Sequence, residues 1–204
     1  MNNGKYSSQE LQMIDTARRL FTEKGFAETT MSDIASETGV KRSTLHYYFA
    51  NKDVMFQAVF GTIVESLVPR LQEIMRSDLP LMERLGLVAD EYFGMFAENP
   101  SMPRFVMSEI QRDVDHLIDT ARTLHLDKVF SLIRDALAAE MAEGKIRKVP
   151  YYVMFTTFYG LITFPFLTKN LYVSWFRMSD DEFREMLAEW KKYFLRQMEN
   201  LLLE

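Results

Sequence analysis

A glycine between two short helical patterns constrains the fold of this chain more than any other feature. Thr30 can cap a helix over residues 31–38, because its hydroxyl can accept a hydrogen bond from the backbone N–H of Asp33. Gly39 can adopt the left-handed conformation that ends such a helix, and the apolar Val40 follows it. The sequence therefore predicts two crossing helices joined by a sharp turn.

The second of these helices is predicted over Lys41 to Tyr48. Val40, Leu45 and Phe49 recur at about four residues and should face inward. The side chains left facing outward are Lys41, Arg42, Ser43, Thr44, His46, Tyr47 and Tyr48. Lys and Arg bind phosphates and guanine, and hydroxyl groups reach phosphates or base edges, so this set fits a DNA-reading surface. The alternative is a helical hairpin whose aromatic residues only pack a core; the glycine turn and the Lys/Arg pair favour DNA binding.

These residues resemble a known family. The pattern T-x-x-x-I-A-x-x-x-G-V-x-x-x-T-L-x-Y-x-F-x-x-K over residues 30–52 resembles the N-terminal domain of the TetR family of transcriptional repressors, and LFTEKGFAETT before it matches that family's first helix and its exit. The resemblance implies a homodimer that binds a palindromic DNA operator, and a helical C-terminal domain that binds a small molecule and releases the DNA. By this resemblance the phosphate-contacting positions are Thr30, Thr44, Tyr47 and Lys52, and the base-reading positions are Lys41, Arg42 and Ser43. His46 stands where the family usually has Tyr.

Composition limits the alternatives. The 204 residues are 48% hydrophobic and include no cysteine, so a buried core is expected, while disulfides, thiolate metal sites and a cysteine nucleophile are excluded. Residues 1–52 hold 7 Lys+Arg against 6 Asp+Glu, and residues 53–204 hold 17 against 23. The N-terminus shows no apolar export segment, so a cytoplasmic protein is expected. Without a phosphate-cradling glycine loop or a recognisable Ser/His/Asp arrangement, an enzyme is not predicted.

The rest of the chain reads as all-α, with no strand-like alternation and no internal repeat. A capping box at Ser7 and Glu10 begins a first helix that ends at Gly25. Further helices are predicted from Lys52 to a break at Pro69, from Pro80 to Asn99, from Met102 to Ile110, and as one long helix from Arg112 to Glu143. We expect an N-terminal three-helix helix-turn-helix head in residues 1–52, and a helical ligand-binding and dimerisation domain in residues 53–204.

Residues 149–168 carry no charge. A transmembrane span of this length is possible, but Pro150, Gly160 and Pro165 dilute its hydrophobicity, so no membrane association is expected. A helix that is apolar all round is otherwise buried all round. With a last helix that begins at the capping box Ser179 and Glu182, it is predicted to form a four-helix interface between two copies of the chain.

The chain is rich in methionine and phenylalanine, which suits an adaptable apolar cavity for a hydrophobic effector. The predicted ligand-binding residues are Tyr92, Met95, Phe96, Met102, Phe105, Met107, Phe155, Phe158 and Tyr159. Met154 belongs to the same set of apolar residues, and the polar groups that could orient a ligand are Tyr92, Arg104, Glu109, His116, Thr156 and Tyr159. The spacing of His116 and His125 places them on different helical faces, so no metal is expected, and no cofactor is predicted.

The function predicted from the sequence is a TetR-like transcriptional regulator, most simply a repressor, that binds its operator as a dimer and is released by a small hydrophobic effector. The alternative is a helix-turn-helix regulator whose apolar domain in residues 53–204 binds a partner protein instead of a small ligand. The two predicted functions differ in what residues 53–204 bind, and they share the DNA-reading head in residues 1–52.

Overall fold

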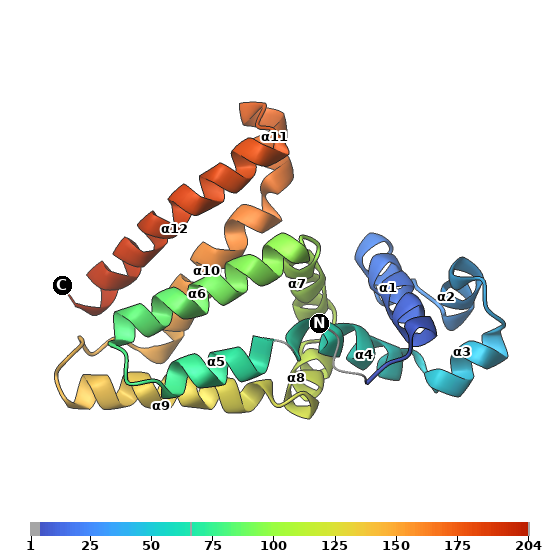
Figure 1. The fold of residues 1–204 in the computed structure, drawn as a ribbon, viewed down its shortest axis with the longest axis horizontal. Coiled ribbons are helices and arrows are strands. Elements are labelled where there is room, and N and C mark those ends of the chain that lie inside the picture. Colours follow the sequence, from blue (N-terminus) through green and yellow to red (C-terminus); the bar gives the residue numbers. More distant parts are fainter. Residues whose placement is uncertain (1–4, 66, 204) are drawn as a thin grey trace. The chain divides into compact units, whose positions relative to one another are not determined.

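The computed structural model describes residues 5–65 and 67–203, and within these the protein forms α-helices and no strand (Figure 1), as the sequence predicts. The elements are α1 (Ser8–Glu23), α2 (Met31–Thr38), α3 (Arg42–Tyr48), α4 (Lys52–Val64), α5 (Leu67–Arg76), α6 (Leu81–Glu98), α7 (Met102–Arg112), α8 (Val114–Thr123), α9 (Leu126–Ala142), α10 (Tyr151–Leu167), α11 (Lys169–Phe176) and α12 (Asp180–Leu202).

The helices pack into two compact units. The first comprises Met1–Ser66 together with Arg104–Leu124, and the second comprises Leu67–Pro103 together with His125–Glu204. Each unit therefore contains two separate segments of the chain. The predicted division between residues 52 and 53 concerns the roles of the two parts and stays a prediction.

The first unit is built on α1, which packs against α2 and α4. Its capping box forms as predicted: the Ser7 hydroxyl accepts from the backbone of Glu10, whose carboxylate accepts from the backbone of Ser7. Thr30 and Asp33 form the same arrangement at α2, and Gly39 ends that helix with a φ of 76°. These devices act within a few residues of each helix end, so the local sequence specifies where α1 and α2 begin and where α2 ends.

Aromatic packing joins the later segment to this unit. Phe105 of α7 lies with its ring centroid 5.1 Å from that of Phe56 in α4 and 6.4 Å from that of Phe21 in α1. All three side chains are buried. The end of α7 is thus part of the core around which the helix-turn-helix is packed.

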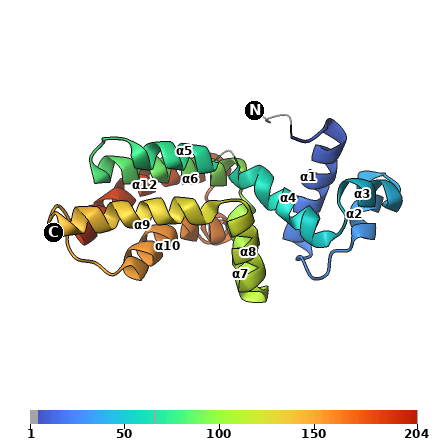
Figure 2. The same ribbon diagram turned by 90° about the horizontal axis from the view of Figure 1, so that it is seen from below.

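The second unit contains α5, α6, α9, α10, α11 and α12. Figure 2 shows α5 lying alongside α6 and α9, and α12 packs on both α6 and α10. The indole N–H of Trp190 in α12 donates to the carbonyl of Leu161 in α10 at 2.9 Å. A salt bridge between Arg84 of α6 and Glu140 of α9, 3.0 Å long and mostly buried, fixes a second pair of helices.

Two predicted helix boundaries were wrong, and one helix was missed. The helix that begins at Lys52 ends at Val64, and Pro69 lies in the first turn of α5, where its missing N–H has no helical partner to lose. The predicted long helix is two helices, because His125 adopts a φ of 62° between α8 and α9. The helix α11 was not predicted.

No single helix among residues 5–65 and 67–203 is long and apolar enough to cross a membrane. The adjoining helices α4 and α5 reach the required length and composition only when they are counted together.

Candidate DNA-binding surface and apolar pocket

The helix α3 presents the predicted DNA-reading side chains to solvent. Leu45 is fully buried and Phe49 nearly so, and they fix the helix on the first unit. On the opposite face Lys41, Arg42 and Ser43 are exposed, and the Tyr47 side chain is 82% exposed. Two cations, a hydroxyl and an exposed tyrosine on one face are the side-chain types that contact phosphates and base edges, which suits a surface for DNA.

The other predicted side chains of α3 are partly buried and held in place. The Arg42 guanidinium donates from Nε to Nε2 of His46 at 3.4 Å, and Nδ1 of His46 lies 3.1 Å from the carbonyl of Ala50. Since a carbonyl only accepts, Nδ1 carries the ring proton. Tyr48 donates to the side chain of Gln9 at 3.4 Å, which links α3 to α1, and Thr44 is half-buried.

Two predicted phosphate contacts have structural partners of their own. The Thr30 hydroxyl donates to the Asp33 carboxylate at 2.7 Å, and this bond with the helix cap keeps the pKa of Asp33 below its usual value. The Lys52 ammonium donates to the backbone carbonyls of Phe26 and Ala27 at 2.8 and 3.1 Å. Lys52 therefore ties the start of α4 to the exit of α1, and at most its remaining proton is free for a phosphate.

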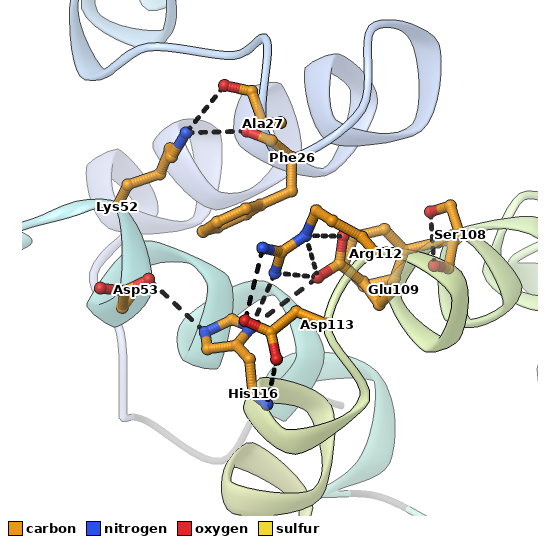
Figure 3. Close-up of polar contacts among 10 residues, drawn as sticks. Phe26, Ala27, Lys52, Asp53, Ser108, Glu109, Arg112, Asp113 and His116 are labelled. Carbon is orange, nitrogen blue, oxygen red and sulfur yellow. Dashed lines mark hydrogen bonds and ion pairs between the residues drawn. The ribbon is translucent and has the colours of Figure 1, made fainter.

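A buried carboxylate lies close to this tie (Figure 3). Glu109 of α7 has a side chain only 1% exposed, and its two oxygens accept from Nε of Arg112 at 3.1 and 3.0 Å. The bond to Glu109 raises the pKa of Arg112, so the guanidinium keeps its charge. Charge-assisted bonds of this kind are the usual way in which a buried carboxylate is tolerated.

The same guanidinium stacks on the head. Its central carbon lies 4.3 Å from the ring centroid of Phe26, and the Lys52 ammonium lies 4.5 Å from the same centroid. Nη2 of Arg112 also lies 3.0 Å from Nδ1 of His116 on α8, and Nε2 of that histidine is buried, 3.5 Å from the Asp53 carboxylate. We call Phe26, Lys52, Glu109, Arg112 and His116 the joint, because they connect α7 and α8 to the exit of α1 and the start of α4.

An apolar pocket lies in the second unit, among α6, α9, α10 and α12. Its empty volume is about 450 Å³, part of it open to solvent. None of its described lining residues is charged; they are Leu85, Val88, Phe130, Ile133, Leu137, Tyr151, Met154, Phe155, Phe158, Tyr159, Met198 and Leu202. A lining of this kind favours an apolar ligand over a charged one.

Two tyrosines supply polar groups at the wall of this pocket. The hydroxyl of Tyr159, which lines the pocket, lies 2.7 Å from the hydroxyl of Tyr92 behind it. Burial raises the pKa of Tyr92 to about 12, and burial also raises the pKa of Tyr159 well above its usual value. Both hydroxyls therefore keep their protons at neutral pH.

The structure brings together only part of the predicted ligand-binding set. Phe155, Phe158 and Tyr159 line the pocket, and Tyr92 and Phe96 pack behind them. Four others lie elsewhere: Phe105 belongs to the core of the first unit, Met107 is exposed, Met102 is buried at the start of α7 and Met95 is half-buried away from the lining.

Sequence reasoning missed the wall that α9 and α12 provide. Phe130, Ile133 and Leu137 lie at helical spacing on one face of α9, which was a readable signal. The polar candidates Glu109 and His116 belong to the joint in the first unit. Among the residues that the structure describes, no group of three or more His, Cys, Asp or Glu could hold a metal ion.

Comparison with known proteins identifies similar regulators. Residues 13–59 match the family described as "Bacterial regulatory proteins, tetR family". The chain is 26% identical over 146 residues to the HTH-type transcriptional repressor KstR2 of Rhodococcus jostii, covering 69% of each chain. It is 26% identical over 102 residues to the fatty acid metabolism regulator protein of Bacillus subtilis, covering 50% of this chain and 53% of the relative.

Solved structures share the fold over nearly the whole chain. The transcriptional regulator FadR from Bacillus subtilis, in complex with stearoyl-CoA, matches with a TM-score of 0.69 at 20% identity, covering 92% of this chain and 96% of that one. A TetR family transcription regulator from Marinobacter aquaeolei matches with a TM-score of 0.71 at 15% identity, covering 96% and 95%. At these identities the likeness concerns the fold.

The joint generates the first prediction. Replacing Arg112 with Met should lower the free energy of unfolding by about 2–3 kcal/mol, because the Glu109 carboxylate stays buried without its partner. Urea unfolding followed by circular dichroism measures this. The control is Arg122→Met on α8, whose ion pair with Asp119 is largely exposed and should leave stability unchanged. Equal stability of the two variants would contradict the role given to Arg112.

Proposed function

We propose that the chain is a TetR-family transcriptional repressor that binds a palindromic operator as a homodimer and is released by a lipophilic acyl effector. In this proposal residues 1–52 read the DNA, and residues 53–204 bind the effector and the second copy of the chain.

The observation that carries the proposal is the exposed face of α3. Lys41 and Arg42 offer cations, Ser43 a hydroxyl, and Tyr47 a large exposed ring, all on one short helix that Leu45 and Phe49 hold on the core. Side chains of these kinds contact phosphates and base edges when a helix enters the major groove. Since a single head has a small net charge, affinity rests on where these few side chains lie.

Dimerisation is supported by apolar side chains that a single copy leaves exposed on the last helices. Tyr152 of α10 is 72% exposed and Phe164, on the same helix, is 57% exposed, while Tyr193 of α12 is exposed as well. α10 carries no charged residue. An apolar surface of this kind on two packed helices suits an isologous interface, in which each copy contributes the same pair of helices.

The acyl effector is supported by the pocket. Its lining is aliphatic and aromatic and it is partly open to solvent, so a charged head would stay in water while a chain enters. Regulators with related sequences include one named for fatty acid metabolism, and one structural neighbour is described in complex with stearoyl-CoA. Such an effector releases DNA only if it binds the DNA-incompetent arrangement more tightly.

The DNA-binding part is tested on DNA selected from a randomised pool by the parent protein. Arg42→Ala should weaken binding by roughly tenfold or more, because a cation on a recognition helix contributes about 1–3 kcal/mol. Tyr47→Ala should weaken it as well. Fluorescence anisotropy at fixed salt measures both, with Arg122→Ala as the control that binds as the parent does. Parent-like binding by both head variants would refute the assigned surface.

The dimer is tested by placing a charge on its predicted interface. Phe164→Glu should convert the dimer to a monomer, because a carboxylate would have to be buried against an uncharged helix. Light scattering after size-exclusion chromatography measures the mass. Val114→Glu on α8 changes another exposed apolar residue to the same charge, and it should remain a dimer. A dimeric Phe164 variant would place the interface on other helices.

The effector is tested by titrating octanoyl-, lauroyl- and stearoyl-CoA into the protein–DNA complex. At least one thioester should release the DNA from the parent. Ile133→Trp should keep DNA binding but lose the release, because the larger ring fills the pocket from α9. Ile118→Trp makes the same change on an exposed face of α8 and should respond as the parent does. Release that persists in Ile133→Trp would mean that the thioester acts at another site.

A further inference from the structure

We propose that the Tyr92–Tyr159 hydroxyl pair recognises an uncharged carbonyl oxygen of the effector, with the Tyr159 hydroxyl as the donor. This inference rests on the proposed function, because it takes the apolar pocket as the effector site. The ligand class is an aliphatic ester, thioester or ketone whose carbonyl reaches the wall where α10 faces α6.

The Tyr92 and Tyr159 hydroxyls together have one proton more than their mutual hydrogen bond uses. Two hydroxyl groups carry two protons, and the hydrogen bond between Tyr92 and Tyr159, 2.7 Å long, uses one of them. Among residues 5–65 and 67–203 neither hydroxyl has another hydrogen-bond partner. When Tyr92 donates to Tyr159, the second proton stays on the hydroxyl of Tyr159, which is the member of the pair that belongs to the pocket lining. The pair therefore presents one donor to a cavity that is otherwise apolar.

None of the described lining residues of the pocket could balance the charge of an ionised ligand. A carboxylate that entered this pocket would lose its hydration and meet none of the cations it needs, since none of the described lining residues is charged. A carbonyl oxygen loses much less hydration, and one hydrogen bond compensates it. Both hydroxyls stay protonated because burial raises the pKa of each, so the donor is present at neutral pH.

Aromatic neighbours hold the Tyr159 side chain in place. The ring centroid of Tyr159 lies 4.6 Å from that of Phe155 and 5.3 Å from those of Phe158 and Tyr92. A ring with aromatic neighbours at these distances has little freedom to turn its hydroxyl away. Tyr151 also lines the pocket, but it is partly exposed at the start of α10, where water can satisfy its hydroxyl. A ligand gains little by replacing that water.

The test compares methyl laurate with dodecane and with laurate, as competitors of Nile red bound to the full chain. The parent should bind the ester roughly tenfold more tightly than the hydrocarbon, which is the size of one net hydrogen bond. Laurate should bind more weakly than the ester. In Tyr159→Phe the preference for ester over hydrocarbon should disappear. In Tyr92→Phe it should remain, because the Tyr159 hydroxyl still donates.

A second readout separates recognition from a change in pocket shape. The infrared band of the ester carbonyl should move to lower frequency when the ester binds the parent, and it should return toward its value in hydrocarbon in Tyr159→Phe. The matched control is Tyr151→Phe, which removes another tyrosine hydroxyl of the lining and should behave as the parent does.

The outcomes separate the inference from the proposed function. If Nile red binds and both lipids displace it equally in the parent and in all variants, the pocket is a lipid site and the hydroxyl pair does not read the carbonyl. If only Tyr151→Phe lost the preference for ester over hydrocarbon, the carbonyl would be bound by Tyr151, and the assignment to Tyr159 would be wrong. If neither the dye nor any lipid binds the parent, the effector proposal and this inference fail together.

Discussion

The compensation of one buried charge ties the N-terminal helices to a distant segment of the first unit. Glu109 lies in a segment far from the helix-turn-helix in sequence, and its carboxylate is removed from water almost completely. Burying such a group is costly unless it is paired, so Arg112 must stay beside it. The same guanidinium stacks on Phe26, whose backbone carbonyl accepts from Lys52. The position of α4 and the exit of α1 are thereby tied to α7 and α8, and these contacts add to the packing of Phe105 within the unit that contains residues 104–124 and the N-terminal helices.

Local chemistry explains which parts of the fold were predictable. The capping boxes at Ser7, Thr30 and Ser179 and the left-handed Gly39 act within a few residues, and the structure contains each of them as predicted. The break between α8 and α9 carries no such signal. His125 adopts a positive φ there without being glycine, where the chain passes from one unit to the other. A non-glycine residue in this conformation is retained when tertiary packing compensates its strain, which a sequence pattern does not reveal.

The candidate sites likewise contain a part that the sequence predicted and a part that it did not. The exposed set on α3 followed from helical spacing around Leu45, because one short helix carries all of it. The pocket draws on four helices, and richness in Met and Phe indicated a cavity without indicating which side chains face it. Phe105 and Phe155 look equivalent in the sequence, yet one lies in the core of the first unit and the other lines the pocket. The Asp53 carboxylate beside His116 and the Phe26 ring against Arg112 were equally invisible, since they come from segments far away in the chain.

One of the links between the two units leads from α9, which lines the pocket, to α8. The wall formed by Phe130, Ile133 and Leu137 belongs to α9, which follows α8 after the break at Leu124 and His125. α8 in turn carries His116, whose ring lies 4.7 Å from that of Phe56 and 5.3 Å from that of Phe26, centroid to centroid. α9 is therefore joined to the helix that carries His116 through a break that contains one residue whose backbone conformation is unusual. This link alone does not make a switch: a ligand changes DNA affinity only to the extent that it binds one arrangement of these helices more tightly than the other.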